Sequence, residues 1–283
     1  IDAERMTSEF GSIDTVDPRN EDLPASICST QLNLQAEDME DAIEKANIGY
    51  AVAPYITALS GNSRFIDGKD LGHNDTRMEL WEKAFDIGDF ENEDIDIGKL
   101  NSFFDSFEDI KERMKNQPRI VNDTGLEGIE EEYAEVAEEN AFDVAQGMFW
   151  KDARIKAVEE IEGEEQVRDD LIVEFRQNST QPTLEEDIAV HAFYIGRVLY
   201  EQSDEIDDDD SLLDDIEKVN ENRYKAMRQG LDAQLYNDSG DLVDAEEVIA
   251  EELEKARKGL EAEGITDPGY LEKLEYRLEN SVT

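Results

Sequence analysis

The chain has 283 residues, of which 74 are Asp or Glu and 27 are Lys or Arg, so its formal net charge is −47. Such an acidic surface repels the phosphates of nucleic acids and the anionic head groups of lipids, and we expect neither as a partner. The apolar runs are also far shorter than the roughly 20 residues that cross a bilayer, so no membrane partner is expected.

The acidity predicts an environment rather than a chemistry. Hydrophobic residues make up 39% of the chain and recur with helical and strand periods, which predicts a folded protein and not a disordered acidic chain. Molar salt shortens the Debye length to about 3 Å and screens the repulsion between carboxylates. We therefore expect a salt-rich cytoplasm, as in haloarchaea; the alternative is an acidic protein of an ordinary cell. Cys28, the one cysteine, cannot form an internal disulfide, in keeping with a reducing interior.

The N-terminal half is predicted to mix helices with one early strand. After an irregular segment at 1–26, the pattern predicts a strand over 27–34, with Cys28 as a small buried residue. Apolar residues at spacings of three and four predict a helix over 37–59, which Pro54 kinks or restarts. The further elements expected in this half are a polar loop over 60–69, a short helix around 75–83, an acidic loop over 84–98, and helices over 100–115 and 129–146.

The C-terminal half begins with two predicted strands, 149–158 and 171–175, joined by an acidic turn over 159–170. An amphipathic helix over 184–201 follows, with Thr183 as its N-cap. The charge run that starts there, at 201–211, is expected to be a solvated loop. A helical part over 212–283 comes last, with helices expected over 211–235, 244–263 and 268–280. Few strands among many helices predict an α+β fold in a single domain, 1–283.

The common catalytic signatures are absent from the sequence. It contains no Walker-type phosphate loop, no dinucleotide-binding glycine turn, no Gly-x-Ser-x-Gly elbow and no His-Glu-x-x-His. The two histidines, His73 and His191, are too few for a histidine-rich metal site. His191 is predicted to be a core or rim residue of its helix.

Three segments carry polar groups that suit ligand binding. Gln31 and Asn33 alternate on a strand and share one face of the sheet. The loop from Asn62 to Arg77 is rich in glycine and contains Arg64 and Arg77. Arginine makes bidentate contacts to carboxylate or phosphate, although both side chains could instead pair with surface carboxylates.

The third segment comprises the two strands of the C-terminal half. Asp152 and Arg154 are two residues apart on one strand, and Glu174 and Arg176 are two apart on the next, so each pair projects from one face. A carboxylate beside an arginine suits a divalent metal with polyphosphate. An ion-pair ladder across the strands explains the same pattern equally well.

These segments, taken in order, resemble a known family. The most specific stretch runs from Ala53-Pro54-Tyr55 into Gly61-Asn62-Ser63-Arg64-Phe65, then Gly68, Gly72, Arg77 and Trp81. It is similar to a loop that reads Ala-Asn-Ser-Pro-Phe, then Gly, Gly, Arg and Trp in the glutamate–cysteine ligases and the related carboxylate–amine ligases. The supporting stretches are Cys28–Leu34 with Glu37-Asp38-Met39, Arg154, Glu174-x-Arg176, and Asn222-Arg223 through Arg228 and Leu231.

The resemblance implies a fold and a reaction. The fold would be an antiparallel half-barrel sheet flanked by helices, related to glutamine synthetase. The reaction would join the γ-carboxylate of glutamate to the amine of cysteine through an acyl phosphate, with ATP and Mg²⁺ as cofactors. The same family branch allows another amine as the acceptor.

The resemblance also implies roles for particular residues. Glu174 would bind the metal, and Arg176 and Arg154 would be the catalytic contacts to the transferring phosphate or the substrate carboxylate. The nucleotide would be contacted by Gln31, Asn33 and Arg228. The amino-acid pocket would be shaped by Asn62, Ser63 and Arg77.

The sequence departs from the family in two respects. Arg64 stands where the loop of the family has a proline, and no Gly-x-Glu-x-Glu pattern of metal-binding carboxylates occurs in residues 1–26. Because this pattern is missing and members of the family continue beyond the position of Thr283, we expect a partial catalytic domain truncated at both ends, more severely at the N-terminus. A function of a different class, a non-catalytic acidic binding protein, would make no use of the paired Glu-x-Arg strands.

Overall fold

The fold is built around one long helix, α2 (Met39–Ser60), in a computed structural model that describes residues 28–66, 69–84, 98–116, 151–158, 170–203 and 212–282. The Asp38 side chain caps its N-terminus by accepting from the backbone N–H groups of Glu40 and Asp41, both at 3.0 Å. The helix predicted over 37–59 is confirmed. The predicted restart at Pro54 is wrong, because the helix is buried continuously from Ile48 to Ser60 and this packing holds the turn together.

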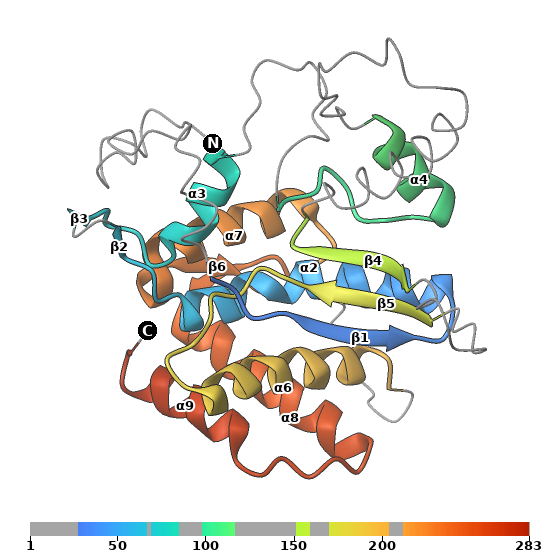
Figure 1. Ribbon diagram of the computed structural model, residues 1–283. Coiled ribbons are helices and arrows are strands. Elements are labelled where there is room, and N and C mark those ends of the chain that lie inside the picture. The colour runs from blue at the N-terminus through green and yellow to red at the C-terminus, as the bar shows by residue number, and fades with distance from the viewer. Residues whose placement is uncertain are drawn as a thin grey trace, which may run out of the picture.

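An antiparallel sheet covers one side of α2, in the strand order β1 (Leu32–Ala36), β5 (Asp170–Phe175) and β4 (Ala153–Val158). The pairs Leu32–Phe175 and Ala153–Phe175 place one apolar row across all three strands. The pair Ile155–Val173 forms a second apolar row on the same face. Figure 1 shows α2 behind these strands, with no described helix in front of them. The opposite face of the sheet is therefore where the polar residues of the strands project.

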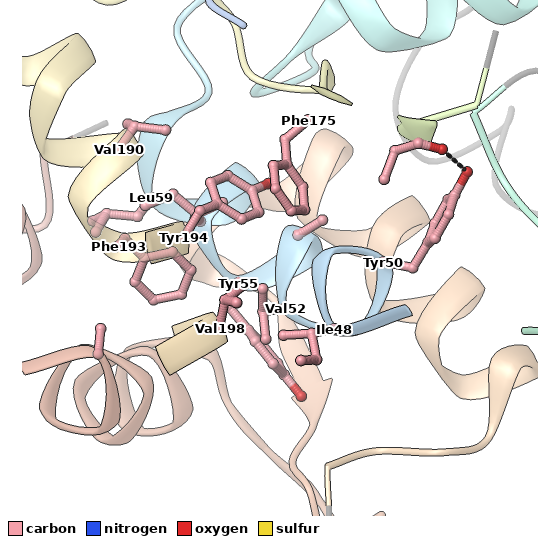
Figure 2. Close-up of a cluster of buried hydrophobic side chains, with 14 of the residues drawn as sticks. Ile48, Tyr50, Val52, Tyr55, Leu59, Phe175, Val190, Phe193, Tyr194 and Val198 are labelled. Carbon is pink, nitrogen blue, oxygen red and sulfur yellow. Dashed lines mark hydrogen bonds between the residues drawn. The ribbon is translucent and has the colours of Figure 1, made fainter. Parts of the chain in front are cut away.

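The remaining helices pack around α2 from two sides (Figure 1). On one side lie α6 (Leu184–Glu201), α8 (Ala245–Ala262) and α9 (Tyr270–Glu279). On the other side lie α7 (Ile216–Gln229) and, against it, α3 (Thr76–Ala84). The core between these layers gathers Tyr55, Phe193, Tyr194 and Val198, as Figure 2 shows.

Most predicted elements are confirmed, with shifts that have local causes. Thr183 caps α6 through a complete capping box with Glu186. The helix predicted over 100–115 begins only at Phe107, where α4 (Phe107–Asn116) starts, because Ser106 caps it and Phe104 pairs with the side chain of Asn47. The strand predicted over 27–34 begins at Leu32, and Cys28 before it is exposed rather than buried. His191 is half-buried and bonds Thr30, as a rim histidine.

The structure adds short elements that the sequence pattern did not predict. The predicted helix over 211–235 ends at Gln229, because Gly230 adopts a positive φ of 57° and leads into a 3₁₀ turn, η4 (Gly230–Asp232). A hairpin of β6 (Gln234–Tyr236) and β7 (Leu242–Asp244) follows. The loop predicted over 60–69 likewise contains strand β2 (Phe65–Ile66) and the start of β3 (Lys69–Asp70).

Helices packed on small antiparallel sheets make an α+β fold, as predicted. The half-barrel related to glutamine synthetase stays a prediction, as do the single catalytic domain over 1–283 and its helical part over 212–283. The irregular segment 1–26, most of the acidic loops, and the helix predicted over 129–146 lie outside the described residues. Among the described helices, none is both long and apolar enough to cross a bilayer.

A buried charge network joins α6 to α8. The fully buried Arg197 contacts Glu252 at 2.7 Å and Glu201 at 2.8 Å, and Lys255 pairs with Asp238 beside them. Burial raises the pKa of Glu252 to about 7, against the pull of Arg197 in the other direction. A cavity of about 440 Å³ opens beside this network, but its buried charged groups are already paired with one another.

We predict that Gly49→Ala destabilises the protein. An added Cβ would lie 2.0 Å from Cε1 of Phe175, whose ring is buried and stacked on Tyr194 with centroids 5.0 Å apart. The clash should lower the free energy of unfolding by about 1–3 kcal/mol, although alanine is favoured over glycine in a helix by about 1 kcal/mol. Denaturant unfolding measures the change. The double variant Gly49→Ala/Phe175→Leu should lose less than the two single changes together, and strict additivity would contradict this account.

A second prediction concerns Glu252→Gln. Because the pKa of Glu252 is raised in the folded protein to about 7 from an ordinary 4.5, the folded state holds the proton more tightly than the unfolded state. The free energy of unfolding of the parent should therefore fall between pH 4.5 and 7, by at most about 3 kcal/mol from this group. Glu252→Gln removes this fall, so its stability relative to the parent should rise from pH 5 to pH 8.

Unfolding in denaturant at both pH values and one fixed salt concentration measures this difference. The matched control is Glu251→Gln, a change at the exposed neighbouring position of the same helix. If the two variants show the same pH dependence relative to the parent, the raised pKa of Glu252 is wrong.

Candidate functional site

Polar side chains from all three strands meet on the face of the sheet that α2 does not cover. The strand register places Asn33, Glu174 and Arg154 in one row across β1, β5 and β4. Nε of Arg154 lies 2.5 Å from Oε2 of Glu174. Glu174 itself is buried, with 4% of its surface exposed. This arrangement is the cross-strand ion pair that one reading of the sequence predicts.

Two further cations surround the same carboxylate. Nε of Arg176 lies 3.4 Å from Oε2 of Glu174, and Nζ of Lys156 lies 3.6 Å from Oε1. We call Asn33, Arg154, Lys156, Glu174 and Arg176 the sheet-face cluster. Three cations around one carboxylate leave a formal charge of +2, in a chain whose net charge is −47.

Arg176 is the member of the sheet-face cluster with spare hydrogen-bonding capacity. Its Nε and Nη1 atoms are buried and have no hydrogen-bond acceptor in the described part of the chain. Burial and the nearby charge of Arg154 lower the pKa of Arg176, while Glu174 and Asp152 act in the opposite direction. Buried guanidinium nitrogens that lack hydrogen-bond acceptors are stabilised by an anion that supplies them.

An irregularity in β5 follows directly after Arg176. Leu32 pairs with Phe175 and Ser29 with Ser179, so two residues on the first segment oppose three on the second. This count defines a β-bulge, which ends regular pairing and re-aims side chains. Gln177 turns toward α2, where Nε2 donates to Ala53 O at 2.6 Å and to Thr57 Oγ1 at 2.7 Å. Gln31, exposed, lies opposite this bulge.

The predicted amino-acid pocket residues lie in a second group beside the bulge. Nε of Arg77 donates to Ser179 Oγ at 2.9 Å, and its Nη2 donates to Gln177 O. Asp75 accepts from Ser63 Oγ at 2.7 Å and from Ser179 Oγ at 2.8 Å. We call Ser63, Asp75, Arg77 and Ser179 the loop cluster; it is anchored to the chain that leaves β5.

Asn62 and Arg64 flank the loop cluster. Asn62 is exposed, and its Nδ2 donates to Thr180 O at 2.9 Å. Arg64 pairs with Asp70 at 2.9 Å on the surface, as the surface-pair alternative predicts. Arg77, in contrast, is buried and pairs with no carboxylate among the described residues, so that alternative does not hold for it.

Arg228 lies apart from the sheet, between α7 and α3. Its Nη2 contacts Glu79 at 2.8 Å, and its guanidinium carbon lies 4.4 Å from the ring centroid of Tyr224. The other carboxylate oxygen of Glu79 lies 2.6 Å from Nδ1 of the buried His73. No contact between Arg228 and the sheet-face cluster is found in the described residues.

Sequence reasoning missed several residues of these groups. Lys156 follows Arg154 by two positions, so strand alternation alone could have placed it on the same face. Asp75 and Ser179 meet only because the loop folds back onto the bulge, and no local pattern signals this contact. His73 and Glu79 sit six residues apart across a helix start, which periodicity does not relate.

The sheet-face cluster fits an oxyanion better than a bare metal ion. Its arginines offer paired donors for phosphate or carboxylate oxygens. Glu174 is its one carboxylate, and within the described residues no three His, Cys, Asp or Glu side chains gather as a metal site. Mg²⁺ bound here would therefore require ligands beyond Glu174.

Comparison with known proteins places the sequence in a family. The family model of glutamate–cysteine ligase family 2 (GCS2) matches residues 8–282. The chloroplastic glutamate–cysteine ligase of Medicago truncatula is 38% identical over 60 residues, and that of Nicotiana tabacum is 37% identical over 60 residues. Each match covers 21% of this chain and 12% of the relative. Because the family model spans nearly the whole sequence, the chain belongs to glutamate–cysteine ligase family 2.

Proposed function

We propose that this chain is part of an ATP-dependent ligase that joins the γ-carboxylate of glutamate to the amine of cysteine. The observation that carries the proposal is the cationic sheet-face cluster, in which the buried Nε and Nη1 atoms of Arg176 have no hydrogen-bond acceptor among the described residues. The relatives named above are glutamate–cysteine ligases, which supports the same class of reaction. ATP and Mg²⁺ are the expected cofactors.

The proposed reaction has two steps. The γ-carboxylate of glutamate attacks the terminal phosphorus of ATP, ADP leaves, and an acyl phosphate forms. The amine then attacks the acyl carbon, loses a proton, and expels inorganic phosphate. The first step moves negative charge from the carboxylate to the leaving ADP, and the second builds it on the acyl oxygen and then on the leaving phosphate. Fixed cations in a water-poor site therefore lower both barriers. We assign this task to Arg176 and Arg154, which both lie beside Glu174.

The other residues have supporting roles in the proposal. Glu174 holds the two arginines side by side and is offered as one ligand of Mg²⁺. Asn33 lies on the edge strand β1 and Gln31 directly before it, and both are assigned to the nucleotide. Asn62, Ser63 and Arg77 shape the amino-acid pocket from the loop beside the bulge, where Arg77 acts through its backbone and serine contacts. Arg228 provides a further anion contact from α7.

A different amine acceptor is the second candidate function. Arg64 stands in the loop where the family has proline, and it is exposed and paired with Asp70. A cation at this point suits any acceptor that carries a carboxylate, cysteine included, so the loop is compatible with cysteine and with other amino acids. ADP release with glutamate and a panel of amines distinguishes the two candidates, because a cysteine ligase must prefer cysteine.

We predict that Arg176→Ala weakens the binding of ATP about 10- to 100-fold. Hydrogen bonds to a charged group contribute roughly 1.5–3 kcal/mol, and tenfold corresponds to about 1.4 kcal/mol. Calorimetric titration of ATP into the parent and the variant measures the effect, with circular dichroism to verify the fold. The matched control is Arg257→Ala, which removes an arginine paired with Glu275 away from the sheet. Equal affinity of parent and Arg176→Ala would refute the proposed role.

We further propose a salt-rich cytoplasm as the setting of the protein. Helix α8 alone exposes Glu246, Glu247, Glu251, Glu254 and Glu261. Like charges this dense repel one another unless salt screens them.

The free energy of unfolding should therefore fall when salt is lowered from 2 M to 0.1 M, where the Debye length grows from below about 3 Å to about 10 Å. Thermal unfolding followed by circular dichroism at a series of KCl concentrations measures the change. A melting temperature that does not depend on salt would contradict a salt-adapted surface.

A further inference from the structure

We propose that Arg223 of α7 is a positioning residue for the sheet-face cluster. It neutralises the carboxylate of Asp152 and thereby leaves Arg176 available to an anionic ligand. The inference rests on the proposed function only for the identity of that ligand.

Two nitrogens of the Arg223 guanidinium contact the carboxylate of Asp152. Nε lies 2.5 Å from Oδ2 of Asp152, and Nη2 lies 3.2 Å from Oδ1. The third nitrogen, Nη1, pairs with Glu82 of α3. Both Arg223 and Asp152 are buried, with 7% and 8% of their surface exposed. Burial alone would lower the pKa of Arg223, but the two carboxylates raise it above its ordinary value, so the guanidinium stays charged.

Asp152 is the link between Arg223 and the sheet-face cluster. Its backbone oxygen accepts from the N–H of Arg176 at 2.8 Å, and it lies two residues before Arg154. Its backbone N–H donates to Gly98 O at 3.0 Å, and Tyr50 donates its hydroxyl to Ala153 O at 2.7 Å (Figure 2). Tyr50 of α2 therefore holds the backbone at the start of β4, and Arg223 of α7 holds the carboxylate of Asp152 directly before it.

The surroundings of Arg223 are shaped for its guanidinium. Gly98 has a φ of +80°, and a Cβ there would lie 2.1 Å from Nη2 of Arg223 and 2.7 Å from Oδ1 of Asp152. Only glycine fits this backbone conformation and this spacing together. On the other side, Arg223 of α7 pairs with Glu82 of α3, and Arg228 of α7 pairs with Glu79 of α3. These two ion pairs tie α3 to α7.

The role follows from what Asp152 would do without its partner. Its charge already acts on Arg176, whose pKa it raises. A buried carboxylate left unpaired recruits the nearest cation, because an unpaired charge in the interior is costly. Arg176 is a cation within reach, since its backbone N–H already donates to Asp152 O at 2.8 Å and its Nε and Nη1 atoms have no hydrogen-bond acceptor among the described residues. Without Arg223, Asp152 would therefore compete with the ligand for Arg176.

This mechanism makes a prediction that a purely structural role does not. Arg223→Met should weaken the binding of ATP, or of inorganic tripolyphosphate as a simpler probe, at least tenfold. The double variant Asp152→Asn/Arg223→Met should bind within threefold of the parent, because it removes the competing charge. Arg223→Lys should lie in between, since lysine keeps the charge but cannot form the two-branched contact. Arg257→Met is the surface control, and circular dichroism verifies the fold of each variant.

Nuclear magnetic resonance of the arginine side chains provides a readout that needs no ligand. The Nε–Hε signal of Arg176 should shift and exchange more slowly with water in Arg223→Met, and it should return toward the parent in the double variant. If the double variant binds as weakly as Arg223→Met, or if the Arg176 signal does not move, the positioning role is refuted. If the parent and Arg176→Ala both fail to bind ATP while the signal moves as described, the proposed function fails and the positioning role stands.

Discussion

The contact between Gly49 of α2 and the ring of Phe175 determines where the candidate site lies. The absence of a Cβ at Gly49 lets the central strand β5 approach α2 closely, and Tyr194 stacks on the other side of the ring. Because side chains alternate along a strand, fixing Phe175 on the inner face fixes Glu174 and Arg176 on the outer one. The hydrophobic core and the polar cluster are thus two faces of one strand, and a shift of β5 in the core would move both.

The few cations of this acidic chain are divided between two buried tasks. Arg197 and Lys255 sit among Glu201, Asp238 and Glu252, where carboxylates outnumber them and the group joins α6 to α8. On the sheet the balance is reversed, because Arg154, Lys156 and Arg176 share one carboxylate. The first group has a surplus of negative charge, and the carboxylate of Asp238 adds to the burial that raises the pKa of Glu252. The second has a surplus of positive charge, which an anionic substrate would neutralise.

The sequence was informative where structure depends on local periodicity. The spacing of apolar residues predicts α2 and α6, and strand alternation predicts that Arg154, Glu174 and Arg176 share a face, which their contacts confirm. It failed where the outcome depends on distant partners. The bulge after Arg176 exists because the chain must turn Gln177 toward α2 and Ser179 toward Asp75. The three-residue strands β6 and β7 are too short for a periodic signal. Arg223 meets Asp152 across 71 residues of sequence, a pairing that no motif expresses.

The two interpretations of strands β4 and β5, an ion-pair ladder and a ligand site, are compatible with each other. In the ladder, Glu174 holds Arg154 at 2.5 Å and keeps Arg176 within 3.4 Å, so the guanidinium groups are oriented before any ligand arrives. Preorganised charges need not rearrange when a phosphate is transferred, which is what makes them effective. A carboxylate that holds two arginines still leaves an excess of positive charge, whereas a second free carboxylate beside them would reduce it. Asp152 is that second carboxylate, and because Arg223 engages it, the excess of positive charge beside Glu174 is preserved.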